Sequence, residues 1–154
     1  MLAFALFLHV TAACIWVGGM AFAVFALRPA AGLLPPEYRS AVWEAALTRF
    51  FAVTLISVVL ILLTGFHMLA KLYGGFAGAP LHVSLMFGLG LLMILIFGHA
   101  LFAPFRRLRA AISAGLPELA QRQLTQLRWL VTGNLILGII TIGVATGGRL
   151  GALH

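Results

Sequence analysis

The sequence predicts an all-α fold: an integral membrane four-helix bundle with both chain termini on the outer (periplasmic) side. The first observation is composition, since 63% of the 154 residues are apolar and only 8% are charged. A water-soluble domain of this size could not bury so much apolar surface. The second observation is a set of four long apolar stretches, and the third is the gathering of basic residues between them. The stretches cover residues 2–27, 50–70, 81–104 and 129–146.

Each stretch is long enough to cross a bilayer, which takes about 20 residues of helix. Flanking signals extend the helices further. Pro36 and Glu37 favour the start of the second helix. Pro104 predicts a kink in the third helix, and Gly115 with Pro117 separates the third from the fourth. We therefore expect one domain, 1–154, with helices over about 2–28, 36–73, 80–114 and 117–148.

The distribution of charge predicts the topology. Eight of the ten Lys and Arg residues follow the first or the third stretch: Arg28, Arg39, Arg49, Arg106, Arg107, Arg109, Arg122 and Arg128. Positive residues stay on the cytoplasmic side, so these two segments face inward. The net charge of +7 then reflects topology and not nucleic-acid binding. The glycine-rich turn over 73–80 faces outward, and its shortness predicts that the second and third helices are antiparallel neighbours.

These features predict a multi-pass membrane protein, with the lipid bilayer as its first partner. Histidines mark the candidate site. His9, His67 and His82 come from three different helices near the outer end, whereas His99 lies near the inner end and His154 is the last residue. A histidine within lipid is costly unless it pairs, binds a ligand or reaches the interface. His9 has the fewest structural explanations because apolar residues flank it on both sides.

Neutral imidazole binds haem iron, copper and zinc. Thioether sulfur suits Cu(I) and can also be an axial haem ligand. Met68 follows His67 directly, and Met86 shares a helix face with His82. Methionine is also a common core filler, so both explanations stay open. Lys71 and Arg149 are cations at the same end, either as interfacial anchors or as partners for haem propionates.

A pair of stacked haems does not fit this sequence. Two such haems require ligand histidines on one face of a helix. His82 and His99 are separated by about 26 Å and about 260° of rotation. One haem near the outer end is the most that the pattern accommodates.

The first helix resembles that of the copper-resistance D (CopD) family over residues 8–20, which include His9, Trp16, Gly18 and Gly19. The segments 27–30, 80–93, 102–109 and 147–149 are also similar to small members of that family. A more distant likeness is to HemJ-type protoporphyrinogen oxidases. Their third helix opens with histidine, valine, lysine and leucine, and this chain has Ser84 in place of the lysine. That difference counts against the oxidase activity.

The CopD resemblance implies a location in the bacterial inner membrane and copper handling there, and the HemJ likeness implies haem b. We expect one haem b for electron transfer, with His9 and either His67 or His82 as axial ligands. Such a protein would be a candidate haem-dependent oxidoreductase with a redox protein or a quinone as partner. Copper binding or translocation is the alternative, with His9, His67, Met68, His82 and Met86 as ligands. A cofactor-free structural subunit of a membrane complex is a further alternative. Homo-oligomer formation stays open.

Cysteine labelling tests the topology. In a background in which the single native cysteine, Cys14, is replaced by alanine, cysteines placed within 74–79 should react with an impermeant reagent added outside. Cysteines placed within 111–115 should not react. The reverse pattern would invert the side assigned to every histidine.

Overall fold

A computed structural model describes residues 1–149, without the side chains of residues 36, 37 and 149. His154 therefore lies outside the described residues. The described chain is helical, joined by short turns. The elements are α1 (Leu2–Phe22), the π-helix η1 (Ala23–Leu27), α2 (Arg28–Gly32), α3 (Pro36–Tyr73), the 3₁₀ turn η2 (Phe76–Gly78), α4 (Leu81–Ala100), the π-helix η3 (Leu101–Phe105), α5 (Arg106–Ser113) and α6 (Pro117–Arg149).

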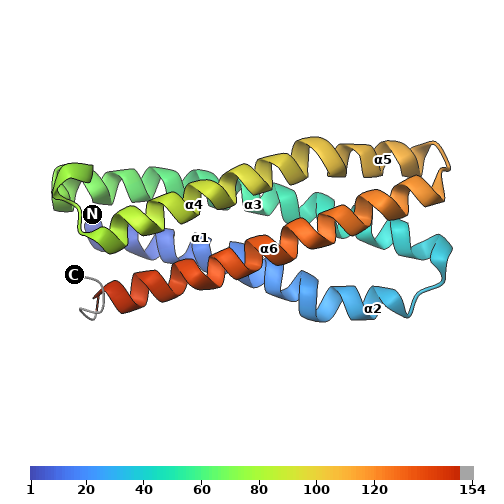
Figure 1. Cartoon of the computed structure of the whole chain (residues 1–154), viewed down its shortest axis with the longest axis horizontal. Helices are drawn as coiled ribbons and strands as arrows, with labels where there is room; N and C mark the ends of the chain where they lie inside the picture. The colour runs from blue at the N-terminus through green and yellow to red at the C-terminus, as the bar shows by residue number, and fades with distance from the viewer. Residues whose placement is uncertain (150–154) are drawn as a thin grey trace.

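Four long apolar helices run the length of the molecule, as expected for a four-span membrane bundle. The segments apolar enough to span are Leu2–Gly32, Tyr38–Tyr73, Leu81–Ser113 and Pro117–Gly148. The start of α1, the turn η2 and the last turns of α6 lie at one end, and α2 and α5 lie towards the other (Figure 1). We call these the histidine end and the arginine end. Which end faces the periplasm stays a prediction.

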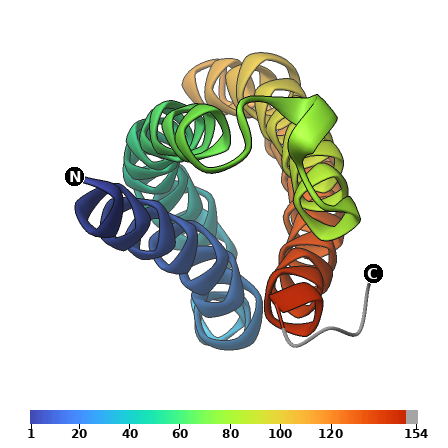
Figure 2. The same cartoon turned by 90° about the vertical axis from the view of Figure 1, so that its left-hand side faces the viewer.

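The bundle is built from two helix pairs. α1 packs along α3, and α4 packs along α6. The pairs join where α1 contacts α6 and where α5 contacts both α3 and α6. α3 and α4 approach each other less closely along their backbones, but they meet through Phe66 and Phe87, whose ring centroids are 5.6 Å apart. α3 and α4 are therefore neighbours, as predicted, although they do not form one of the two tight pairs. The turn between them begins with Gly74 and Gly75, both at positive φ, and it carries the chain across to the second pair (Figure 2).

The two π-helical turns of the bundle, η1 and η3, each lie at a proline. Pro104 lies inside η3, and Pro29 lies just after η1. Proline has no amide hydrogen and its ring collides with the carbonyl one turn earlier. A π-turn accommodates both effects without breaking the rod. The kink predicted at Pro104 is therefore a π-segment within a continuous helix, and a similar segment positions Arg28.

An aromatic cluster holds the two helix pairs together at mid-length. Phe51 of α3 packs against Phe97 of α4 and Phe105 of η3, with ring centroids 5.8 and 4.8 Å apart. Trp16 of α1 meets Phe97 edge-on at 6.0 Å. Outside this cluster many large apolar side chains are exposed, such as Phe4 on α1. A continuous apolar exterior suits a protein that is solvated by lipid.

Truncating the centre of the aromatic cluster should destabilise the bundle. Phe51 is 3% exposed and touches three other rings. Phe51→Ala should lower the free energy of unfolding by about 3–5 kcal/mol because it leaves a cavity. Thermal unfolding of the detergent-solubilised protein measures the loss. Phe102→Ala, at an exposed position, is the matched control, and equal losses in both variants would contradict the assigned core.

Candidate functional site

His9 lies on the face of α1 that packs on α3. Ala5, Ala12 and Trp16 are buried along this face, and His9 follows Ala5 by four residues and precedes Ala12 by three. The His9 side chain is half-buried. Its position two turns into the helix places a polar ring between two apolar rods, where it needs a partner within the protein.

Thr64 of α3 is that partner. The His9 Nδ1 and Thr64 Oγ1 atoms are 2.9 Å apart. The Thr64 hydroxyl has one proton, and it donates this proton to the backbone carbonyl of Leu60. The Thr64 oxygen therefore accepts from His9, so the imidazole proton sits on Nδ1. Neutral His9 then carries its lone pair on Nε2, the atom through which a histidine held in this way binds a metal.

Gly65 permits the close approach of the His9 ring to α3. A Cβ atom at Gly65 would lie 3.3 Å from His9 Cε1, tighter than most carbon contacts. A side chain here would push the ring away from Thr64. Sequence analysis did not identify Thr64 or Gly65. The available signal was a threonine and a glycine together within an apolar span, which favours contact with another helix.

His82 lies at the start of the other helix pair. It is half-buried at the first turn of α4, and it packs so closely on Gly148 of α6 that a Cβ atom at Gly148 would overlap its side chain. The His82 Nδ1 atom is buried and has no hydrogen-bond partner within the described part of the chain. A buried nitrogen without a partner is costly, and it is available as a donor or as a ligand.

The other predicted site residues differ in their surroundings. His67 and Lys71 are exposed on the last turns of α3, while Met68 and Met86 are half-buried. The side chain of Arg149 lies outside the described residues. His99 is exposed on the last turn of α4, away from η2 and the start of α1. It therefore lies away from the other three, as the sequence predicted.

The two partly buried histidines belong to different helix pairs. His9 is bonded across the α1–α3 contact, whereas His82 packs across the α4–α6 contact. Within residues 1–149, no group of three or more His, Cys, Asp and Glu side chains is placed to hold a metal ion. Imidazole and thioether ligands from facing helices stay a prediction, as does haem b.

Sulfur atoms and one amide lie deeper in the bundle. Met20 is 1% exposed and lines a small cavity together with Asn134. Asn134 Nδ2 donates to the backbone oxygen of Met93, 3.3 Å away, and its Oδ1 is buried without a partner. The Met93 sulfur lies 3.8 Å from Thr141 Oγ1. Two thioethers and a polar amide thus occupy the interior between the histidine end and the arginine end.

Comparison with known proteins identifies one family. The family model described as copper resistance protein D matches residues 44–147, more than half of the chain. This range contains His67, His82 and the methionines Met68 and Met86, and it excludes His9. No curated protein and no solved structure matches the chain.

The Thr64 contact predicts the protonation of His9. Nitrogen chemical shifts of isotopically labelled protein should show a protonated Nδ1 and an unprotonated Nε2 on this ring. Thr64→Val keeps the side-chain shape and removes the acceptor, so the preference for this tautomer should weaken. Thr132→Val, at a threonine that bonds only to its own helix, is the control. A His9 ring protonated on Nε2 in the native protein would contradict the proposed geometry.

Proposed function

The chain belongs to the copper resistance protein D family, and we propose that copper is its cargo, bound as Cu(I) at the histidine end of the bundle. The main support for this proposal is the hydrogen bond between His9 and Thr64. A ligand ring held by an outer hydrogen bond has one orientation and a more basic free nitrogen. The cost of keeping a polar ring between two apolar helices is offset if Nε2 binds a metal.

Soft donors of the kind that Cu(I) prefers are available on the same helices. Met68 follows Thr64 by one helical turn, so its thioether projects from the same side of α3. Met86 follows His82 by one turn on α4. We propose that His9 and Met68 form the primary site and that His82 and Met86 add ligands from the second helix pair. His67, being exposed, is the entry ligand.

The interior sulfurs suggest a path for transfer. Met20 lies on the His9 face of α1, about 16 Å further along the helix. Met93 lies at the same depth as Asn134, to which its carbonyl is bonded. We propose that Cu(I) leaving the His9 site is passed to these thioethers, where sulfur replaces water as ligand. This step makes the protein a copper-translocating membrane protein.

The family match favours copper over haem b. A haem protein of the expected kind would need a second axial imidazole facing His9, and the observed partner of His9 is a threonine. Absorbance separates the two functions, since bound haem has an intense Soret band and Cu(I) has none.

Removing the His9 ring tests the copper proposal. His9→Ala should weaken Cu(I) binding by the purified full chain at least about 100-fold because it removes the oriented ligand, and Thr64→Val should weaken it about 10–100-fold. Titration against a chromophoric Cu(I) chelator in neutral detergent measures both.

His99→Ala is the matched control, because His99 is an exposed imidazole on another helix. It should bind Cu(I) like the native chain. Equal loss in His99→Ala and His9→Ala, or no loss in His9→Ala, would refute the assignment of the site. Met20→Leu should leave equilibrium binding intact and slow transfer in vesicles, which separates the two parts of the proposal.

A further inference from the structure

A second cavity lies at the arginine end of the bundle. It is a shallow hollow that opens to the surface, and its enclosed part has room for about one water molecule. Its walls come from η1, α2, α3 and α6, and most of them are apolar. The lining residues are Ala23, Val24, Arg28, Trp43, Leu47, Leu124, Leu127, Arg128, Val131 and Thr132. None of them belongs to the proposed copper site.

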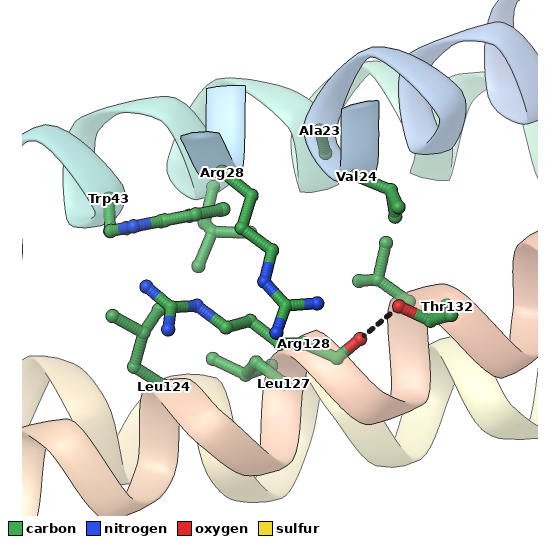
Figure 3. Close-up of a pocket in the computed structure, with 10 residues that line it drawn as sticks. Ala23, Val24, Arg28, Trp43, Leu124, Leu127, Arg128 and Thr132 are labelled. Atoms are coloured by element: carbon green, nitrogen blue, oxygen red, sulfur yellow. Dashed lines mark hydrogen bonds between the residues drawn. The ribbon is translucent and has the colours of Figure 1, made fainter. Parts of the chain in front are cut away.

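Two arginines from different helices enter this cavity. Arg28 reaches in from the start of α2, and Arg128 enters from α6 with its guanidinium beside the Trp43 ring (Figure 3). The guanidinium carbon of Arg128 lies 5.2 Å from the centre of that ring. Stacking on an indole orients the planar fork of an arginine and shields one of its faces from solvent.

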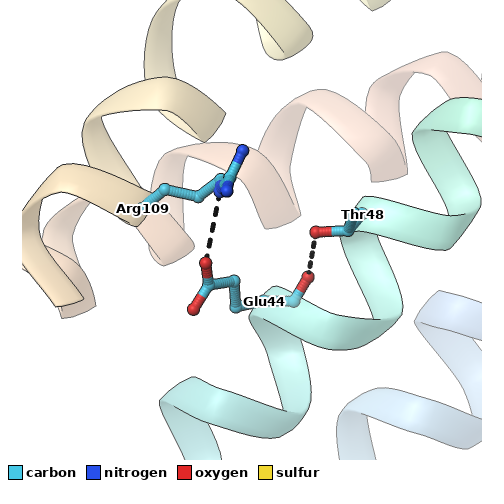
Figure 4. A network of polar contacts seen from close by, with 3 residues as sticks. All are labelled: Glu44, Thr48 and Arg109. Atoms are coloured by element: carbon cyan, nitrogen blue, oxygen red, sulfur yellow. Dashed lines mark hydrogen bonds and ion pairs between the residues drawn. The ribbon is translucent and has the colours of Figure 1, made fainter. Parts of the chain in front are cut away.

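No acidic side chain that the structure describes pairs with the two arginines of this cavity. Arg28 and Arg128 bring like charges into the same hollow. Among the side chains that the structure describes, the single ion pair joins Arg109 and Glu44 at 3.2 Å, between α5 and α3 (Figure 4). That carboxylate is thus engaged with an arginine outside the cavity. Clustered cations at a partly buried site are destabilising unless an anion joins them.

Buried donors without acceptors lie at the same place. Arg128 Nε and the Trp43 indole nitrogen are both buried and have no hydrogen-bond partner among the side chains and backbone that the structure describes. Trp43 is 3% exposed, so its nitrogen is out of reach of bulk solvent. A buried donor without an acceptor destabilises the folded protein. The arrangement is therefore incomplete without a ligand that supplies negative charge and several acceptor oxygens.

We propose that this cavity binds the phosphate of an anionic phospholipid headgroup. Arg28 and Arg128 supply the paired, fork-shaped donors that phosphate oxygens accept. A phosphate at the mouth of the hollow would reach both guanidinium groups, and the neighbouring Ala23, Val24 and Val131 give an apolar surface for the first carbons of an acyl chain. The basic end of the helices is also where anionic headgroups meet a membrane protein, in pockets of this kind between helices.

Native mass spectrometry of the purified full chain in neutral detergent tests the proposal. The probes are phosphatidylglycerol, which is anionic, and phosphatidylcholine, which is zwitterionic with no net charge and whose choline ammonium already neutralises its phosphate. The native chain should hold one phosphatidylglycerol, and the double variant Arg28→Gln/Arg128→Gln should bind it at least about tenfold more weakly, the factor expected for losing a charge-assisted hydrogen bond. Phosphatidylcholine binding should not differ between the two chains.

Arg106→Gln/Arg107→Gln is the charge-matched control, because both arginines are exposed at the same end. It should stay within about twofold of the native chain, as surface charges contribute little. Equal losses in both double variants would show general attraction to the basic end and overturn the site. Removal of the bound lipid by millimolar inorganic phosphate, or equal binding of both lipids, would overturn the headgroup assignment. If the double variant does not fold, Trp43→Phe keeps the stacked ring, removes one donor and should weaken phosphatidylglycerol binding.

Discussion

In a lipid solvent, each polar group must find its partner inside the protein, and this constraint governs where the chemistry of the bundle can lie. Most hydroxyls in the spans satisfy it locally. Ser57 and Thr141 donate to the carbonyl four residues earlier, at 3.0 and 2.8 Å. Other groups have no such local bond. His9 bonds to Thr64 from another helix. His82, Thr54 and Asn134 each have a buried atom with no partner among the described residues.

The pairing of helices decides how these groups are distributed. Because α1 packs on α3 and α4 packs on α6, His9 and His82 are each held within a separate pair. The aromatic cluster around Phe51 joins the pairs at mid-length. A cargo bound between the two pairs at the histidine end would draw ligands from both, and the buried thioethers of Met20 and Met93 lie beyond it. The arginine end has a different chemistry, with cationic donors and an aromatic ring, and it serves a different ligand.

Local patterns predicted the helices well and predicted the contacts between them poorly. Pro36 and the glycine-rich turn mark the bounds of α3 because helix ends depend on neighbouring residues. His9 stood out because a lone imidazole in lipid is costly. Thr64 did not, since a partner from another helix leaves no trace in spacing along one chain. The short loop correctly predicted that α4 lies beside α3, but the closer packing of α1 on α3 could not be predicted because loop length carries no information on it. The cavity of Arg28 and Arg128 was missed because the topology rule already accounted for both arginines.

The central claim is that the Nε2 atom of His9 binds Cu(I). The bond to Thr64 places the ring proton on Nδ1 and leaves the Nε2 lone pair available to the metal. X-ray absorption at the copper edge of the Cu(I)-loaded full chain tests it most directly. We expect imidazole scattering from a nitrogen about 2 Å from the metal together with sulfur scattering from thioethers. In His9→Ala the imidazole contribution should fall while sulfur scattering persists, and His99→Ala should leave the spectrum unchanged. A native spectrum with sulfur ligands alone, or an imidazole signal that survives in His9→Ala undiminished, would contradict the account.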